Sequence, residues 1–167
     1  MKNCLLHTLL VLSFAGSTAL AQSPDSMHLQ RSLAVSASFA SSDNFSNIYV
    51  VTTDNAVLKY DSVGRKVAAY TNNRLGTAAV VDASNPLKIL VWYPDFQTVV
   101  WLDRTLNEMG RLNFAQAELY SVRCVAMAFD GNIWAFDDAV SKLVKLNLEG
   151  MALLESQPLN VYFPRRF

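Results

Sequence analysis

The 167-residue sequence contains very few of the side chains that build metal sites and nucleophilic sites. Its two histidines are His7 and His28, and its two cysteines are Cys4 and Cys124. It also lacks a His-Glu-x-x-His pair, a paired-cysteine spacing, a Gly-x-Ser-x-Gly elbow and a glycine-rich phosphate loop. These absences argue against a zinc centre, a serine hydrolase and a nucleotide site. The sequence therefore indicates no catalytic residue, no metal and no cofactor.

Charge of one sign is also missing. The chain has 14 basic and 14 acidic residues, and its like-charged blocks are no longer than two, as in Arg65-Lys66 and Arg165-Arg166. A protein that binds nucleic acid needs a basic stripe to neutralise the phosphates. We therefore expect no nucleic-acid partner.

One apolar run, from Leu5 to Ala15, follows a basic start and precedes small residues at Ala19 and Ala21. This order is typical of a secretory signal peptide spanning residues 1–21, with cleavage after Ala21. The run is short for a membrane span, which needs about 20 residues, so an uncleaved anchor is the weaker alternative. We expect a periplasmic or secreted protein with no transmembrane segment after cleavage.

Removal of the signal is expected to leave a flexible leader, residues 22–32, followed by one repeat domain from 33 to 167. The formal charge becomes −1, because Lys2 is lost, and Cys124 becomes the one remaining cysteine. A single cysteine cannot form an internal disulfide, so the fold must depend on its hydrophobic core. Cys124 has apolar neighbours and is predicted to be a small buried hydrophobe.

Three similar sequence segments follow one another at a spacing of about forty residues. Ile48, Ile89 and Ile133 are 41 and 44 residues apart, and each lies in a short run rich in Val, Ile and aromatic residues. A second apolar run follows about ten residues later and ends in Asp or Asn at a turn. A period near forty with strand-like content is typical of a β-propeller blade, which has four strands.

Each repeat supplies four apolar runs, separated by the Asn, Asp and Gly residues that favour tight turns. The small-residue run fits the innermost strand, and the aromatic-rich runs fit strands packed between blades. Lys59 and Lys145 alternate with leucines, which predicts a more exposed third strand. Residues 113–120 are the one segment with helix-compatible composition, and we expect at most a turn of helix there.

The predicted fold is all-β: a propeller-like array of about three four-stranded antiparallel blades. The units run roughly over 33–75, 76–119 and 120–156, and residues 157–167 read like the start of a fourth. Closed propellers have four or more blades, so the array is incomplete. Either the chain is a fragment of a longer protein, or two copies close one ring, or the units form an open stack.

The repeat resembles the NHL-type and related six-bladed propeller repeats. The resemblance is carried by residues 47–51 with 57–64, and by residues 131–136 with 143–150, whereas the middle unit departs from the pattern. With its signal peptide, the chain also resembles small exported propeller proteins of Bacteroidota with no assigned role. This resemblance implies a fold and leaves the function open, because such propellers include scaffolds, ligand binders, lyases and hydrolases.

Candidate ligand-binding residues come from the turns between second and third strands. Tyr93, Asp95 and Phe96 surround a proline and are expected to be exposed, and Asp137 and Asp138 fall at the matching turn of the third unit. Carboxylates at the blade turns could bind a hard cation or act as acid and base, but Asp and Asn at tight turns more often cap their own backbone. We expect capping to be the main role of these carboxylates.

The function that these features favour is an exported, non-catalytic binding or scaffold protein of the bacterial cell envelope, with a protein or glycan ligand. A homodimer is a further expected partner in the case that the chain is complete. The alternative is a fragment of an envelope propeller hydrolase or lyase whose catalytic groups lie in missing blades.

Overall fold

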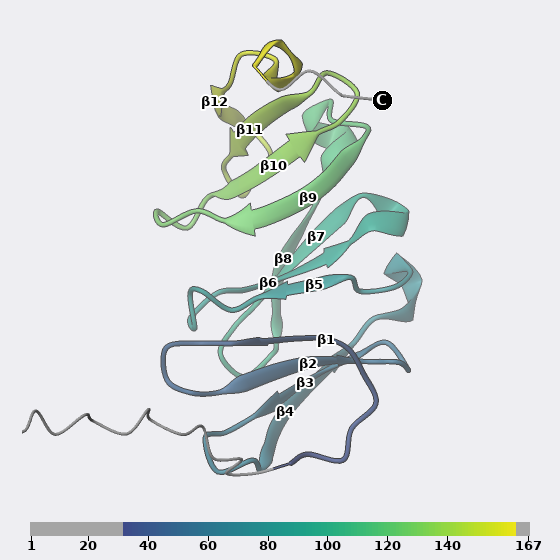
Figure 1. The fold of residues 1–167 in the computed structure, drawn as a ribbon, viewed down its shortest axis with the longest axis vertical. Coiled ribbons are helices and arrows are strands. Elements are labelled where there is room, and N and C mark those ends of the chain that lie inside the picture. Colours follow the sequence, from purple (N-terminus) through teal and green to yellow (C-terminus); the bar gives the residue numbers. More distant parts are fainter. Residues whose placement is uncertain (1–31, 163–167) are drawn as a thin grey trace, which may run out of the picture. The chain divides into compact units, whose positions relative to one another are not determined.

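The computed structural model describes residues 32–162, and these form three four-stranded antiparallel sheets (Figure 1). The first sheet contains β1 (Ala37–Ser42), β2 (Ile48–Thr52), β3 (Ala56–Tyr60) and β4 (Lys66–Thr71). The second contains β5 (Val80–Asp82), β6 (Ile89–Tyr93), β7 (Thr98–Leu102) and β8 (Glu108–Asn113). The third contains β9 (Val122–Met127), β10 (Ile133–Asp137), β11 (Lys142–Leu146) and β12 (Ala152–Glu155). We call these sheets blades 1, 2 and 3.

Each blade is a simple meander in which every strand pairs with the next one along the chain. The predicted all-β array of three four-stranded blades is therefore confirmed. The predicted signal peptide and most of the predicted leader lie outside the described residues. Within residues 32–162, no helix is long and apolar enough to cross a membrane.

The turns between third and fourth strands are built alike in all three blades. In blade 1, the Asp61 carboxylate accepts the N–H groups of Val63 and Arg65 at 3.1 and 2.8 Å. Asp103 and Asn147 make the corresponding pairs of bonds in blades 2 and 3. This is the capping role expected of Asp and Asn.

The fourth residue of this turn has positive φ in every blade: Gly64 at 77°, Leu106 at 63° and Gly150 at 88°. Glycine adopts this conformation without a steric penalty, whereas leucine pays about 1 kcal/mol or more for it. Leu106 is nevertheless buried in the core between blades 1 and 2. Burial of a leucine side chain contributes roughly 2 kcal/mol, which exceeds that penalty.

Blade 2 lies between the other two and is covered on both faces. Every residue of β6 and β7 is buried. One core cluster joins blades 1 and 2, and a second joins blades 2 and 3, where the Trp92 and Phe114 rings meet edge to face at 5.4 Å. The prediction that aromatic-rich strands are packed between blades is confirmed for blade 2.

Short 3₁₀ turns follow the fourth strand of each blade: η1 (Asn73–Leu75), η3 (Phe114–Ala117) and η4 (Leu159–Val161). A fourth, η2 (Pro94–Phe96), lies between β6 and β7. The turn η3 confirms the short helical segment expected within residues 113–120. In blade 1, η1 is capped by Asn72, whose side chain accepts the Arg74 N–H at 3.1 Å, and Asn113 caps η3 in the same way.

Two sequence-based expectations about single residues are wrong. Lys59 is buried, because its Nζ donates at 2.8 Å to the Arg104 carbonyl of blade 2 and lies over the Tyr49 ring, 5.3 Å from its centroid. Cys124 is exposed, because it lies on the face of blade 3 that points away from blade 2. In both cases the exposure depends on which blade face is covered, and strand alternation does not specify that.

Candidate functional site

A meander places its turns at two opposite ends of a blade. The turns between strands one and two, and between strands three and four, share one end, which we call the 1–2 end. The turns between strands two and three share the other, the 2–3 end, with the connections to the next blade. Residues that are distant in sequence can therefore meet at either end.

The predicted site residues of blade 2 lie at the 2–3 end, but only some of them are exposed. Phe96 is 56% exposed, as expected for a proline turn, whereas Tyr93 is completely buried. The expectation that Tyr93 is exposed is therefore wrong, because it is the last residue of β6 and packs against blade 1. The Asp95 carboxylate accepts the Thr77 N–H at 2.8 Å and so holds the connection between blades.

The predicted carboxylates of blade 3 also have structural contacts. Asp137 is buried and accepts the Ala139 N–H at 2.9 Å, and Asp138 forms an ion pair with Arg123 at 3.1 Å. Among residues 32–162, no three His, Cys, Asp or Glu side chains are close enough together to hold a metal ion. The carboxylates at these turns thus act mainly as caps and cross-links.

Two amide side chains at the 2–3 end connect each blade to the next. Asn55 donates to the Gly76 carbonyl at 2.7 Å and accepts the Ala78 N–H at 2.8 Å. Gln97 donates to the Val122 carbonyl at 3.1 Å and accepts the Val122 N–H at 2.7 Å. Sequence reasoning missed both residues, because an amide in a turn gives no sign of a partner more than 20 residues away.

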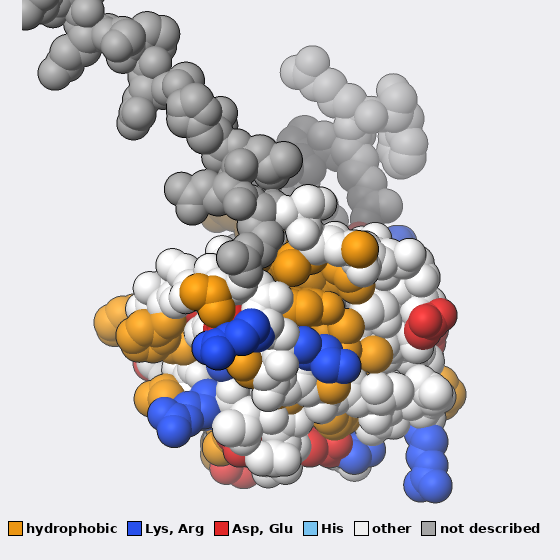
Figure 2. All heavy atoms as spheres, turned by 90° about the horizontal axis from the view of Figure 1, so that it is seen from below, with side chains coloured by type: hydrophobic (Ala, Val, Ile, Leu, Met, Phe, Trp, Pro, Cys, Tyr) orange, Lys and Arg blue, Asp and Glu red, His pale blue; other side chains and the backbone are white. Residues whose placement is uncertain are grey.

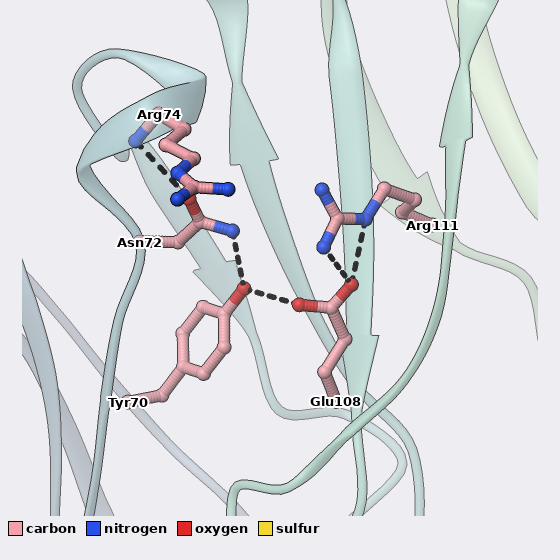
Figure 3. Close-up of polar contacts among 5 residues, drawn as sticks. All are labelled: Tyr70, Asn72, Arg74, Glu108 and Arg111. Atoms are coloured by element: carbon pink, nitrogen blue, oxygen red, sulfur yellow. Dashed lines mark hydrogen bonds and ion pairs between the residues drawn. The ribbon is translucent and has the colours of Figure 1, made fainter.

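A polar cluster joins the outer strands of blades 1 and 2 (Figure 3). The Tyr70 hydroxyl donates to Glu108 at 2.7 Å and accepts from Asn72 at 3.1 Å, and Arg111 Nε donates to the other Glu108 oxygen at 2.7 Å. Burial, followed by the contact with Glu108, raises the pKa of Tyr70 to about 12. Tyr70 is therefore a neutral hydrogen-bond donor at physiological pH.

The buried Tyr93 hydroxyl lies near this cluster and has no hydrogen-bond partner among residues 32–162. Burial is the main cause that raises the pKa of Tyr93 far above its usual value, and electrostatic interactions with the neighbouring Tyr70 and Glu108 side chains add to it. Both Glu108 oxygens accept hydrogen bonds, one from Tyr70 and the other from Arg111. The cluster connects the outer strands of blades 1 and 2.

The 1–2 end carries a different kind of surface. Phe45 and Leu87 are each 67% exposed, and Phe129 is fully exposed. Each lies in the turn between the first and second strands of its blade, so the three blades present one large apolar side chain each. Phe45, Leu87 and Phe129 form what we call the apolar row. None of them belongs to either core cluster.

Two hollows connect the members of the apolar row. The first, of about 420 Å³, lies between blades 1 and 2 and is lined by Phe45, Leu87 and Pro86, among others. The second, of about 470 Å³, lies between blades 2 and 3 and is lined by Pro86 and Phe129, among others. Because Pro86 lines both hollows, the two hollows adjoin at blade 2.

Charged side chains of both signs lie around the apolar row, with Asp43 in the lining of the first hollow and Asp130 next to Phe129 in the chain. Lys59 and Arg104 line the first hollow, and Lys88 lies in the turn beside it. Within residues 32–162, neither Lys88 nor Arg104 belongs to a salt bridge. Burial by itself raises the pKa of the Asp43 carboxyl, but hydrogen bonds from Asn47, Phe45 and Tyr49 outweigh it and hold the pKa below its usual range. Asp43 is thus a carboxylate whose oxygens already accept hydrogen bonds from neighbouring residues at the edge of this surface.

Sequence reasoning missed the apolar row. A signal was present in the sequence, since Phe45 and Phe129 stand inside turn segments rich in Asp, Asn and Gly, outside the strand alternation. A large apolar residue at such a position has no core face to join. These residues lie close to one another because the three blades stack, and the sequence pattern does not show that stacking.

No protein-family model and no curated protein matches this sequence. Solved structures that match include a protein of unknown function from Bacteroides caccae, with a TM-score of 0.55 and 17% identity over 75% of this chain and 50% of that chain. BamB from Moraxella catarrhalis matches with a TM-score of 0.52 and 13% identity over 71% of this chain and 35% of that chain. A streptogramin B lyase matches with a TM-score of 0.54 and 14% identity over 75% of this chain and 42% of that chain.

These similar structures are β-propeller-type proteins. Because their sequence identity to this chain is only 13–17%, the similarity shows a shared fold and nothing about function. Together with the three stacked four-stranded sheets, it defines the class: the described part of this chain is an incomplete β-propeller. The chain spans from about a third to a half of the length of the three proteins. Because one fold can serve several unrelated functions, this architecture does not specify an activity.

Proposed function

We propose that this chain is an exported, non-catalytic β-propeller protein of the bacterial cell envelope that binds a protein or glycan ligand at its 1–2 end. The observation that carries the proposal is the apolar row, Phe45, Leu87 and Phe129. Exposed large apolar side chains gathered at one end of a protein are typical of an interaction site, and aromatic side chains dominate the energy of many interfaces. In the case that these 167 residues are the whole protein, a second copy of the chain is a further partner.

The chemistry of the 1–2 end favours a protein segment over a glycan. Phe129 and Phe45 supply aromatic anchors, and Lys88 and Arg104 supply cations without ion-pair partners among the described residues. A peptide with apolar and acidic side chains complements both features. Phe96 is exposed at the opposite end, so it is the candidate contact for a ligand that binds the 2–3 end.

The ligand surface can be tested with a phage-displayed peptide library selected on the exported protein. Selected peptides are then titrated against Phe129→Ser, Phe45→Ser and, as the matched control at the other end, Phe96→Ser. Removal of a central aromatic contact costs about 2 kcal/mol or more, so we expect at least about a tenfold loss of affinity for the first two variants. Affinity that falls only in Phe96→Ser would place the ligand at the 2–3 end and overturn the assignment.

Export is supported by the sequence pattern of residues 1–21 and has its own test. The protein isolated from the envelope of its native host is measured by intact mass spectrometry. We expect a mature chain that begins at Gln22, because the small residues Ala19 and Ala21 form the cleavage site. A cytoplasmic protein that retains residues 1–21 would contradict this part of the proposal.

The second candidate function is a part of an envelope hydrolase or lyase whose catalytic groups lie in further blades. Its support is the likeness to a streptogramin B lyase, of which this chain covers 42%. The same mass measurement separates the two functions. A longer native chain with His, Glu or Arg side chains gathered at its blade ends favours the enzyme, whereas a mature product ending at Phe167 favours the binding protein.

A further inference from the structure

The two blade-to-blade contacts in this chain are formed in the same way. Each blade has a forward face, which packs on the next blade, and a backward face, which packs on the preceding one. The forward face of blade 1 contains Tyr49, Val51, Val57 and Lys59, and all four are buried against blade 2. The forward face of blade 2 contains Leu90, Trp92, Val99 and Trp101, which are buried against blade 3.

The forward face of blade 3 has the same construction without a fourth blade in the described residues. Its corresponding residues are Trp134, Phe136, Leu143 and Lys145, which occupy the positions of Tyr49, Val51, Val57 and Lys59. The agreement extends to a specific contact. Lys145 lies over the Trp134 ring at 5.5 Å, just as Lys59 lies over Tyr49 at 5.3 Å.

The edges of this face agree as well. Cys124 pairs with Phe136 across the sheet, as Phe39 pairs with Val51 and Val80 pairs with Trp92. Phe39 and Val80 both pack against the core that their blade shares with the next one. On blade 3, by contrast, Cys124 is exposed, and so is Leu154, which is 57% exposed beside Lys145.

The backward face of blade 1 has the residue pattern that packs against a forward face elsewhere in the chain. It contains Ile48, Val50, Leu58 and Tyr60 at the positions where blade 2 has Ile89, Val91, Val100 and Leu102. Figure 2 views blade 1 from this side and shows hydrophobic side chains gathered over the face, with Lys and Arg side chains beside them. Ile48 is exposed there, and Leu58 and Tyr60 are partly exposed.

We infer that the forward face of blade 3 receives the backward face of blade 1 from a second copy of this chain. This builds on the homodimer in the proposed function and names the surfaces that form it. The two faces have the residue pattern that packs twice within the chain, so a third junction of the same kind needs no new chemistry. Two such head-to-tail junctions would close a ring of six blades, within the range of known propellers.

The in-chain contact also predicts a specific bond at the junction. Lys59 Nζ donates to the carbonyl of Arg104, the residue after Asp103 in the 3–4 turn of the next blade. The corresponding carbonyl in blade 1 belongs to Ser62, the residue after Asp61. Lys145 Nζ therefore donates to the Ser62 carbonyl of the second copy. Within one chain, the same Nζ forms an ion pair with Asp130 at 2.6 Å, and at the junction it either leaves Asp130 or binds both acceptors.

Cys124 provides a direct probe, because the inference buries it. The exported full-length chain is examined by light scattering, and the rate at which its thiol reacts with a maleimide is measured. We expect a dimer with a slowly reacting thiol. Ile48→Glu, on the other face of the chain, should give a monomer in which Cys124 reacts at least about tenfold faster, since protection follows the dimer population.

The control is Val140→Glu, because Val140 is similarly exposed and lies in a turn outside both faces. This variant should remain a dimer with a protected thiol, and circular dichroism verifies that each variant is folded. Leu154→Glu tests the receiving face independently of Ile48 and should also give a monomer.

Three outcomes would overturn the inference: a monomeric wild type, a dimer whose thiol protection survives Ile48→Glu, or a longer native chain that supplies its own next blade. All three leave the apolar row untested, because Phe45, Leu87 and Phe129 lie at the 1–2 end. A failure of the peptide titrations would leave the junction standing in the same way. The two proposals can therefore fail separately.

Discussion

Six non-glycine residues between 32 and 162 have positive φ, and all of them lie in turns. Asn55, Gln97 and Ser141 are three of them, and they occupy the same position in the 2–3 turns of the three blades. In the first two blades this strained position aims an amide at the backbone of the next blade. The backbone strain thus positions a contact between blades.

Replacement of Gln97 by alanine should therefore weaken the contact between blades 2 and 3. The variant keeps a Cβ at positive φ, so the backbone strain is unchanged and only the amide is lost. The Val122 N–H and carbonyl lose their partner, and we expect unfolding to become easier by about 1–3 kcal/mol in urea denaturation. Gln116→Ala, an exposed glutamine in η3, is the control and should stay within about 0.5 kcal/mol of wild type.

The two buried tyrosines, Tyr49 and Tyr93, should respond differently to loss of the hydroxyl. Tyr93→Phe removes a buried hydroxyl with no partner among residues 32–162, so we expect unchanged or slightly higher stability. Tyr49→Phe removes the donor to Asp43 at 3.0 Å, and we expect a loss of about 1–2 kcal/mol. Thermal and urea denaturation compare the two variants. Equal destabilisation by both would mean that Tyr93 has a partner.

The element that repeats most faithfully is the turn between third and fourth strands. Its first residue is Asp61, Asp103 or Asn147, and in each blade it caps two backbone N–H groups. In blade 2, the Thr105 hydroxyl, followed by the Asn107 backbone, lowers the pKa of Asp103 to about 2. The carboxylate form is thus favoured by folding.

This shift predicts a pH-dependent role for Asp103. A depressed pKa adds stability above the unfolded value of about 3.9, and that stability disappears as the pH falls to about 2. Asp103→Asn keeps the acceptor oxygen and removes the charge, so we expect the variant to be less stable at pH 6 and nearly equal to wild type at pH 2. Urea midpoints measured across this range check the expectation.

The reverse change provides a matched control. Asn147→Asp places a carboxylate at the same position of blade 3 and should gain stability over the same pH range. A stability difference between Asp103→Asn and wild type that is the same at pH 2 and pH 6 would rule out the linkage.

At the scale of single strands and turns, much of the architecture could be predicted from the sequence. The spacing of Ile48, Ile89 and Ile133 indicated the blades, and Asp or Asn at the turns indicated the reversals. Both signals are local, since a strand or a turn depends on residues within a few positions. The site residues at the 2–3 turns were less predictable, because the exposure of Tyr93 and Asp137 depends on a neighbouring blade.

The stability of the stacked blades depends most on blade 2, because this blade contributes residues to both core clusters. Replacement of Trp92 by alanine removes a buried indole and its contact with Phe114, and we expect a loss of about 3–5 kcal/mol. Val67→Ala, an exposed residue of blade 1, should change stability by less than about 0.5 kcal/mol. Chemical denaturation of both variants measures the difference. A small effect of Trp92→Ala would mean that the blades do not depend on this interface.

At the same scale, the outer faces of blades 1 and 3 matter as much as the core. The residues of both faces follow the pattern of faces that are covered within the chain, so they are suited to a further blade. A propeller-like array is stable in water when such faces and strand edges are covered. The apolar row lies at the ends of the blades and is free to serve a ligand.

Local chemistry was enough to predict the strands, the turns and the three blades that residues 32–162 form. The alternation of side chains along a strand and the dihedral preferences of Asp, Asn and Gly act over a few residues, so they can be read without a partner. The stacking of the blades decided what is buried, what is exposed and what meets. Tyr93, Lys59, Cys124 and the apolar row all depend on a blade about forty residues away, and a short-range pattern carries no information about such a contact.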